Sequence, residues 1–341
     1  MTLQMNTSEQ TARFFSGSEN FRGSVKSNEN LAKHTTMHTG GDARIFLEPE
    51  DEESLIFSLQ KFTEEKIKFF VLGGGSNVVI SDRGLDAVIS TRKLNKVTAN
   101  GNTLETGAGS SWGGIISFCR KNNLGGFESF TGLSGTTGGA VFMNASCFGL
   151  SASDNLLSVR YFDFIDNKIH EYLKNDSDWG YKKSPFQPRG GVTGVSPVRG
   201  GSEQRSANEG EASPLKIILS VKFSVTQGFD SEKSEKCIAE RKEKGHFLAP
   251  SSGSAFKNDP DRGIIAGKLI DECGLKGFSS GNAKIAPWHG NFIINPEQKA
   301  TAQDIKKLSD TVRQIVREKT GIELESEILF VGEEFTENKV K

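Results

Sequence analysis

The chain has 341 residues, more than a single hydrophobic core usually supports, so we expect two or three domains. Hydrophobic residues make up 35% and charged residues 25% of the chain, and the formal net charge is −1. This balance is typical of a globular protein and argues against a general nucleic-acid binder, which needs a basic surface. Because no run approaches ~18 apolar residues and the N-terminus lacks the apolar core of a secretory signal, we expect a cytoplasmic protein without a membrane span.

The four cysteines are scattered along the chain without metal-ligand spacing. They are Cys119, Cys147, Cys237 and Cys273. Cys119 and Cys273 stand at apolar positions of expected helices, where a thiol usually packs as a small hydrophobic group. The cysteines therefore predict no metal site, and they fit a reducing compartment.

The N-terminal part of the chain predicts a small α/β subdomain over residues 31–92. Residues 1–30 are polar with little periodicity, which predicts a flexible lead-in. A strand is expected at 43–47, then a helix that starts at Pro49 with an acidic first turn, as the helix dipole favours. A buried strand follows at 67–72.

The first glycine-rich loop, Leu72-Gly73-Gly74-Gly75-Ser76-Asn77, follows that strand. Three glycines let the backbone turn sharply and come very close to a bound group. Their N–H groups, with the Ser76 hydroxyl and the Asn77 amide, can form an anion-binding nest suited to a pyrophosphate. A tight hairpin turn would explain this stretch by itself equally well.

A second glycine-rich loop favours the binding interpretation. After expected strands at 96–99 and 103–109 and a helix whose buried face carries Trp112, the chain repeats the glycine–hydroxyl pattern. Neither loop ends in Gly-Lys-Ser/Thr or gives G-x-G-x-x-G between strand and helix, which argues against a P-loop and a Rossmann site. Two such loops predict a large phosphate-bearing cofactor held between domains. The second loop's candidate contacts are Ser134, Gly135, Thr136, Thr137, Gly138 and Gly139.

The rest of the chain predicts a second subdomain over 93–228 and a third domain over 229–335. Residues 187–214 carry almost nothing apolar and predict a loop insertion, followed by a strand at 215–225. The third domain is expected to contain helices at 231–244 and from Thr301 to Gly321, and a strand at 290–295. The last expected strand, 322–331, alternates so that Glu323, Glu325 and Glu327 share a face.

Four motifs, in this order, resemble those of the UDP-N-acetylenolpyruvylglucosamine reductase family. They are Leu72–Asn77, Gly132–Ala140, Gly253–Asn258 and Leu324–Ile328. Each motif alone is weak, but the resemblance extends from about Thr35 to Gly332. It implies an α+β fold with three domains, in which two α/β domains of the PCMH type bind FAD and a C-terminal α+β domain binds a UDP-sugar.

The resemblance also implies a reaction. NADPH would reduce the flavin, and the flavin would reduce the enolpyruvyl ether of UDP-N-acetylglucosamine enolpyruvate to the lactyl ether of UDP-N-acetylmuramate, a step of peptidoglycan synthesis. Hydride addition at the β carbon leaves negative charge at the α carbon, which needs a proton donor and stabilising groups. No nucleic-acid partner is implied, and we expect a monomer.

Several site residues follow from the matched motifs. Ser254 matches the family's proton-donating serine, with a simple turn hydroxyl as the alternative. Glu327 matches an acid beside the substrate carboxylate, which makes sense only if Glu327 is protonated or bridged by a cation. Asn258 is expected to hydrogen-bond the substrate. Arg241 and Lys244 are candidates for the UDP diphosphate, although a solvated helix face would explain them equally well.

One departure from the family pattern affects the expected chemistry. The family carries Tyr-Arg-x-Ser-x-Phe, and this chain has Tyr181-Lys182-Lys183-Ser184-Pro185-Phe186. Lys182 keeps the positive charge that would polarise the substrate carboxylate, beside a substrate-binding Tyr181, but it loses the planar bidentate fork. His38 stands where arginine is expected on the flavin side. Neither His38 nor His289 has a second histidine at ligand spacing, so polar loop roles are expected.

Two alternatives remain open at this point. The first is another FAD-linked oxidase or dehydrogenase of the same fold, although such an enzyme has no reason to keep Ser254, Asn258 and Glu327 together. The second, motivated by Lys182, is a UDP-sugar-binding protein with weakened catalysis.

Overall fold

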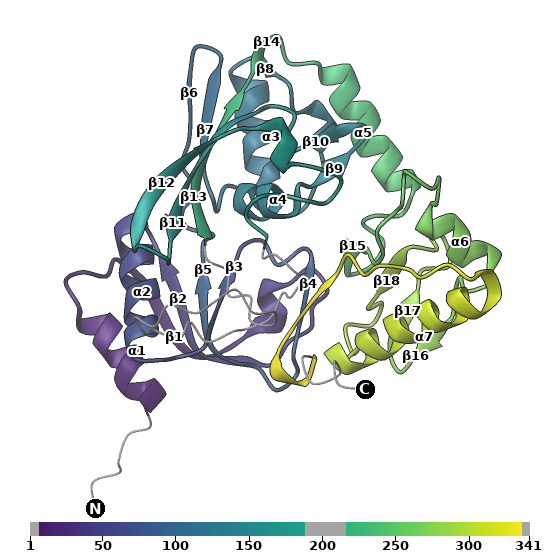
Figure 1. Cartoon of the computed structure of the whole chain (residues 1–341), viewed down its shortest axis with the longest axis horizontal. Helices are drawn as coiled ribbons and strands as arrows, with labels where there is room; N and C mark the ends of the chain where they lie inside the picture. The colour runs from purple at the N-terminus through teal and green to yellow at the C-terminus, as the bar shows by residue number, and fades with distance from the viewer. Residues whose placement is uncertain (1–6, 188–215, 336–341) are drawn as a thin grey trace, which may run out of the picture. The chain divides into compact units, whose positions relative to one another are not determined.

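The fold is taken from a computed structural model, which describes residues 7–187 and 216–335 (Figure 1). These residues divide into two compact units, and each unit is assembled from separate stretches of the chain. Of the described residues, unit 1 draws on 7–29, 43–74, 85–187 and 216–238, and unit 2 draws on 30–42, 75–84 and 239–335. Among the described residues, no helix combines the length and the apolar character that a membrane crossing needs.

The first sheet of unit 1 has the strand order β1-β2-β5-β3, and β5 pairs in parallel with both β2 and β3. Its apolar face packs against helix α2 through Leu55, Leu59 and Phe62, which are buried. Asp51 caps α2 by accepting a hydrogen bond from the Ser54 N–H at 2.8 Å. The predicted strand–helix–strand unit is thereby confirmed, but the predicted helix start at Pro49 is wrong, because Pro49 ends β2 and the helix begins at Glu52 after its cap, Asp51. Its elements are β1 (Gly23–Asn30), β2 (Asp42–Pro49), α2 (Glu52–Glu64), β3 (Phe69–Leu72) and β5 (Leu85–Ser90).

The prediction of a flexible lead-in over residues 1–30 is wrong for residues 7–30. These residues form helix α1 (Thr7–Gly17) and strand β1, and a short helix η1 (Leu31–His34) follows. The reason is aromatic burial: Phe15 is almost fully buried and packs edge-on against Phe62 of α2, with ring centroids 5.4 Å apart. The buried rings of Phe15 and Phe21 therefore anchor a stretch whose average composition is polar.

The second sheet of unit 1 is antiparallel, with strand order β12-β11-β13-β7-β6. Helices α3 and α4 lie against it (Figure 1), and the fully buried Trp112 of α3 packs edge-on against Phe130 at 4.5 Å. The predicted apolar face of α3 is confirmed. The strands and helices are β6 (Val97–Asn100), β7 (Thr103–Gly107), α3 (Trp112–Lys121), α4 (Thr137–Met143), β11 (Leu156–Asp163), β12 (Lys168–Leu173) and β13 (Lys216–Ser224).

Shorter elements connect these strands and helices. They are β8 (Leu124–Gly125), η2 (Glu128–Phe130), β9 (Ser146–Cys147), β10 (Leu150–Ser151), η3 (Asp176–Asp178) and β14 (Thr226–Gln227). Apart from β1, which lies in the predicted lead-in, the strands of the two sheets of unit 1 fall within the two predicted FAD-binding subdomains, whose boundaries stay a prediction. Of the predicted insertion at 187–214, residues 188–214 lie outside the described residues.

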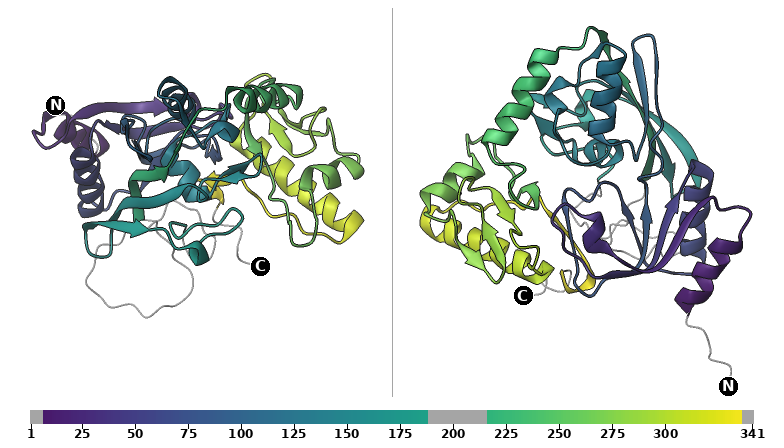
Figure 2. Two further views of the ribbon diagram at one scale, coloured as in Figure 1. Left: turned by 90° about the horizontal axis from the view of Figure 1, so that it is seen from above. Right: turned by 180° about the vertical axis from the view of Figure 1, so that it is seen from behind.

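Unit 2 contains a sheet with strand order β15-β18-β17-β16, against which helix α7 packs (Figure 2). The predicted capping box is present, because Thr301 and Asp304 exchange side-chain-to-backbone hydrogen bonds. Asp82 supplies a second cap by accepting hydrogen bonds from the N–H groups of Ala302 (2.9 Å) and Gln303 (3.2 Å). The elements are β15 (Ser251–Ser254), α6 (Ala266–Glu272), β16 (Ser279–Ser280), β17 (Ala283–Ile285), β18 (Phe292–Ile294) and α7 (Ala302–Thr320).

The last predicted strand, 322–331, is wrong over most of its length. Only β19 (Leu329–Val331) is a strand, paired in parallel with β4 (Val78–Ile80), and a short helix η4 (Glu333–Phe335) follows. Before β19, the chain forms one isolated bridge, and the carbonyl of Leu324 accepts a hydrogen bond from the Arg313 side chain instead of from a strand.

The predicted helix at 231–244 is confirmed as α5 (Ser231–Glu243), whose residues belong partly to each unit.

Candidate functional site

The two glycine-rich loops meet backbone to backbone within unit 1. A Cβ atom added to Gly74 would lie 2.5 Å from the Cα of Gly135, and one added to Gly73 would lie 2.6 Å from Oγ1 of Thr136. Either distance is below any normal contact, so glycine is required at both positions. The prediction that the loops act together therefore has a direct structural counterpart.

The second loop is held in place by its own backbone. The N–H of Thr137 donates to the Ser110 carbonyl at 2.9 Å, and the N–H of Gly138 donates to the Ala108 carbonyl at 2.8 Å. The Thr136 hydroxyl is different: the residue is only 4% exposed, and Oγ1 is buried with no hydrogen-bond partner in the described part of the chain. An unsatisfied buried hydroxyl is costly, so this oxygen is suited to a bound polar group.

Arg92 strengthens the same cluster and was missed in the sequence. Its Nη2 donates to the Gly74 carbonyl at 3.0 Å, which fixes the first loop where it faces the second. Ser134 and Gly139 are exposed at the ends of the second loop. Nothing in the sequence around Arg92 indicated this contact, because it joins residues 18 positions apart in two different loops.

The remaining residues of the first loop belong to unit 2. Gly75 has φ +66°, and a Cβ there would overlap the His34 carbonyl, so this glycine is also required. The Asn77 amide donates from Nδ2 to the Glu327 carbonyl at 2.9 Å. Asn77 therefore links the first loop to the predicted acid, a role that its prediction as a cofactor contact did not include. Ser76 is partly buried.

Ser254 and Glu327 lie on neighbouring, paired stretches of unit 2. Ser254 ends β15, directly after Gly253 with φ +74°, and the N–H of Glu327 donates to the Ala255 carbonyl at 2.9 Å. Glu327 is 9% exposed, whereas the Ser254 hydroxyl has no hydrogen bond to any other residue that the structure describes. A serine oxygen without a competing partner remains available to a ligand.

The other carboxylates of the predicted alternating strand are ion-paired at the surface. Glu325 pairs with Lys257 at 2.5 Å, and Glu323 pairs with Arg313 at 2.6 Å. Both carboxylates are largely exposed to solvent, as expected for glutamates with no role in catalysis. The prediction that Glu323, Glu325 and Glu327 share a face is therefore wrong: residues 322–328 do not form a strand, and Glu327 is buried whereas the other two carboxylates are exposed.

Asn258 has a local structural role. Its Oδ1 accepts a hydrogen bond from the Ala266 N–H at 3.0 Å, at the start of α6. This bond ties Asn258 to the backbone at the start of α6.

Arg241 and Lys244 create a cationic region at the end of α5. Arg241 is only 5% exposed, so it is not part of a solvated helix face, whereas the partly exposed Lys244 pairs with Glu240. Burial, followed by the charges of Arg241, His289 and Lys244, lowers the pKa of His246 to about 4. An anion is the ligand that such a region favours.

Two histidines pack around Phe292 in this region. The ring of His289 stacks on Phe292 with centroids 3.9 Å apart, and His246 meets Phe292 edge-on at 4.7 Å. Burial, then the charge of Lys244, lowers the pKa of His289, so both imidazoles are held neutral. The other histidine considered in the sequence, His38, is exposed and lies 2.9 Å from Gln298 through Nδ1.

Tyr181 and Lys182 form a turn in unit 1 that is tied to helix α4. The turn's Gly180 carbonyl accepts from Asn144 Nδ2 at 2.8 Å, just after α4 ends, and Lys182 itself has φ +54°. The Lys182 ammonium lies 5.8 Å from the centre of the exposed Tyr181 ring. Since α4 begins in the second glycine-rich loop, this helix connects that loop to Lys182.

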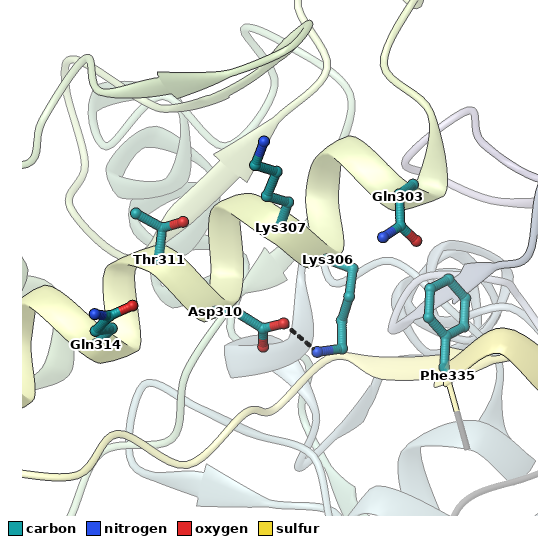
Figure 3. A pocket seen from close by; sticks show the side chains of 7 residues that line it. All are labelled: Gln303, Lys306, Lys307, Asp310, Thr311, Gln314 and Phe335. Atoms are coloured by element: carbon teal, nitrogen blue, oxygen red, sulfur yellow. Dashed lines mark hydrogen bonds and ion pairs between the residues drawn. The ribbon is translucent and has the colours of Figure 1, made fainter. Parts of the chain in front are cut away.

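A shallow hollow on α7 contains none of the predicted site residues (Figure 3). Gln303, Lys306, Lys307, Asp310, Thr311, Gln314 and Phe335 line it. Lys306 and Asp310 pair with each other across one helical turn within it. Within residues 7–187 and 216–335, no group of three or more histidine, cysteine or carboxylate residues is arranged to hold a metal ion.

These features define the class of protein. Two glycine-rich loops in backbone contact, with an unsatisfied hydroxyl between them, suit the pyrophosphate of a dinucleotide cofactor. A family model described as an FAD binding domain matches residues 43–171, which include both loops. The chain is thus an FAD-dependent oxidoreductase of α+β fold.

The comparisons also identify the family. A family model for the UDP-N-acetylenolpyruvoylglucosamine reductase C-terminal domain matches residues 244–331. The reductase of Treponema denticola is 39% identical, over 91% of this chain and 94% of its own length. That of Borreliella burgdorferi is 37% identical, over 89% of this chain and 93% of its own length. The crystal structure of the reductase from Thermus caldophilus is similar with a TM-score of 0.68 at 30% identity, covering 92% of this chain and 100% of that chain. The chain belongs to the UDP-N-acetylenolpyruvoylglucosamine reductase family.

Proposed function

We propose that the protein catalyses the NADPH-dependent, FAD-mediated reduction of UDP-N-acetylglucosamine enolpyruvate to UDP-N-acetylmuramate in peptidoglycan synthesis. The observation that supports the proposal is the backbone hydrogen bond between Ala255 and Glu327, which pairs the stretch carrying the proposed proton donor, Ser254, with the stretch carrying the proposed acid. The pairing lies within the residues matched by the family's C-terminal domain. NADPH as the reductant, a cytoplasmic location and a monomeric state are part of the proposal.

The residues of the glycine-rich loops fit FAD. The close approach of Gly73 and Gly74 to Gly135 and Thr136 is possible only because no side chain is present at these glycines, and the Thr136 hydroxyl between the loops lacks a partner among the described residues. We assign the phosphate contacts to these residues together with Gly135 and the other predicted loop positions. When bound, FAD would supply the hydride-transfer chemistry, with NADPH as hydride donor and the β carbon of the enol ether as acceptor.

In this proposal Ser254 is the proton donor. After hydride addition the α carbon carries negative charge, and the Ser254 Oγ–H protonates it. A free hydroxyl is a poor acid, so its usefulness depends on accurate placement and on the high basicity of that carbon. The absence of a competing hydrogen bond at Ser254 among the described residues supports this role.

The remaining predicted residues bind or orient the substrate. Glu327, which is largely buried, would lie beside the α carbon and the substrate carboxylate, where it can stabilise the developing charge only when it is protonated or bridged by a cation. Arg241 and Lys244 bind the diphosphate, with Asn258 and Tyr181 as polar contacts. Lys182 supplies a point charge to the carboxylate where the family pattern has an arginine.

An anaerobic absorption experiment tests the proposal. Purified protein should show a flavin band that NADPH bleaches and that UDP-N-acetylglucosamine enolpyruvate restores. A band that is bleached but not restored would favour the oxidase alternative or weakened catalysis at Lys182. Absence of flavin after reconstitution with FAD would contradict the proposal as a whole.

A further inference from the structure

Asn291 is a buried asparagine that makes three hydrogen bonds to Ala255 and Phe256, the two residues after Ser254. It is 4% exposed and directly precedes β18. Its Oδ1 accepts from the Phe256 N–H at 2.9 Å, and its Nδ2 donates to the Phe256 carbonyl at 2.8 Å. Its main-chain carbonyl accepts from the Ala255 N–H at 2.8 Å.

Asn291 and Glu327 together satisfy every backbone polar group of Ala255 and Phe256. Three of the four groups are bonded by Asn291, and the fourth, the Ala255 carbonyl, accepts from the Glu327 N–H at 2.9 Å. A side-chain amide is needed here because β15 ends at Ser254 and its register with β18 is already irregular. The amide of Asn291 therefore replaces a strand partner where the ladder stops.

Asn291 is in turn held by the histidine cluster. Its N–H donates to Nδ1 of His289 at 3.2 Å, and the His289 ring stacks on Phe292. Phe292 is the cross-strand partner of Ser254 in the pairing of β15 with β18. The lowered pKa of His289 keeps the ring neutral, which the ring needs in order to accept this hydrogen bond.

We infer that Asn291 is a positioning residue for proton transfer from Ser254. Its amide fixes the backbone that carries the Ser254 hydroxyl, and through the Ala255–Glu327 pairing it fixes the relation of that hydroxyl to the acid. Asn291 acts through Ala255 and Phe256 and has no chemical step of its own. The inference rests on the proposed function, since it assigns a role within that reaction.

Asn295 provides a matched control at the other end of the same strand. It is fully buried, its Nδ2 donates to the Met37 carbonyl at 2.9 Å, and its Oδ1 accepts from the Ala300 N–H at 2.9 Å. Both asparagines thus use both ends of a buried amide to bind backbone. Only Asn291 reaches the residues that follow Ser254, so the two alanine variants lose similar bonds at different places.

The experiment compares Asn291→Ala with Asn295→Ala by anaerobic stopped-flow, in H₂O and in D₂O, normalised to bound flavin. We expect Asn291→Ala to slow substrate-driven flavin reoxidation ~10²-fold, the size of a small misplacement of a reacting group. The solvent isotope effect should rise because proton transfer becomes limiting. Flavin reduction by NADPH should change less than about twofold, and Asn295→Ala should leave the isotope effect unchanged.

A conservative variant covers the case in which Asn291→Ala does not fold. Asn291→Asp keeps the acceptor for the Phe256 N–H and loses the donor to its carbonyl, so it should give an intermediate rate and a raised isotope effect. Equal slowing in the Asn291 and Asn295 variants, or an unchanged isotope effect at residue 291, overturns the inference. Wild-type protein that the substrate does not reoxidise would overturn the proposed function, and the inference with it.

Discussion

Two regions of the molecule are built in opposite ways: the contact between the two glycine-rich loops in unit 1, and the paired stretches that carry Ser254 and Glu327 in unit 2. In unit 1, backbone meets backbone at Gly74 and Gly135, and the site exists because side chains are absent. In unit 2, side chains decide the geometry, since an asparagine amide holds the backbone beside a serine and a glutamate. The comparison teaches that adding atoms should damage the first region, whereas removing atoms should damage the second.

The largest effect is expected when the Ser254 hydroxyl is removed. Ser254→Ala should slow substrate-driven flavin reoxidation by ~10³-fold, because general acid catalysis of this kind contributes about 10²–10⁴-fold. FAD affinity should not change, which would separate the chemistry of unit 2 from cofactor binding. Ser252→Ala, on the same strand, is the control. Normal reoxidation in the Ser254 variant would remove this serine from the mechanism.

The reverse experiment adds one methyl group to unit 1. Gly74→Ala should weaken FAD binding ~10- to 100-fold, because the new Cβ would force the two loops apart at a strain of about 1–3 kcal/mol. Titration of flavin-free protein, followed by flavin fluorescence, measures this affinity. Gly113→Ala is the control, since a Cβ there meets no atom within 4 Å. Unchanged affinity in the Gly74 variant would contradict the role of the close approach.

A smaller effect is expected at Lys182. Lys182→Arg should raise the rate of flavin reoxidation about 3- to 10-fold, because a bidentate guanidinium holds a carboxylate better than an ammonium does. Lys183→Arg, at the next position of the turn, is the control: it introduces an arginine nearby without changing Lys182. A rate that falls in Lys182→Arg would show that the turn is adapted to lysine.

The smallest predicted effect is a loss of folding stability at acidic pH through protonation of His246. The pKa of His246 is lowered to about 4 from 6.5, so the folded state favours the neutral ring. The free energy of unfolding that depends on this ring is fully present above pH 6.5. It is lost as the pH falls toward 4, because the unfolded state then binds a proton that the folded state does not. Because the ring is partly exposed, we expect a loss of only about 1 kcal/mol between pH 7 and 5.

Urea denaturation at these two pH values measures that loss. His246→Gln should show a smaller drop than wild type, because glutamine does not titrate. His170→Gln, which changes an exposed histidine paired with Asp166 in unit 1, should behave like wild type. An identical drop in His246→Gln and wild type would exclude His246 as the source.

The sequence predicted the parts of the molecule whose signals are local. The capping box at Thr301 and the buried face around Trp112 depend on residues within a few positions of each other, and both are present. The two glycine-rich loops were recognised from composition, and their contact in unit 1 follows the prediction that they act together. The fold class and the family were recognised from motifs in order.

The rest depends on contacts between residues distant in the chain. Phe15 anchors the supposed lead-in only because Phe62 of α2 faces it. The segment before β19 lacks a continuous strand partner, and alternation alone does not reveal that. Asn291 reads as a polar residue beside an apolar strand, and only the three bonds to Ala255 and Phe256 give it a role.

Unit 2 is assembled from three separate stretches of the chain, and this has a consequence for the order of folding during synthesis. Its parts 30–42 and 75–84 leave the ribosome more than 150 residues before the helix that Asp82 caps and the strand that pairs with β4. The two early segments must wait for the C-terminal third before their partners exist. We therefore expect a fragment that starts at residue 239 to fail to fold alone, and a nascent chain to complete unit 2 only near its release.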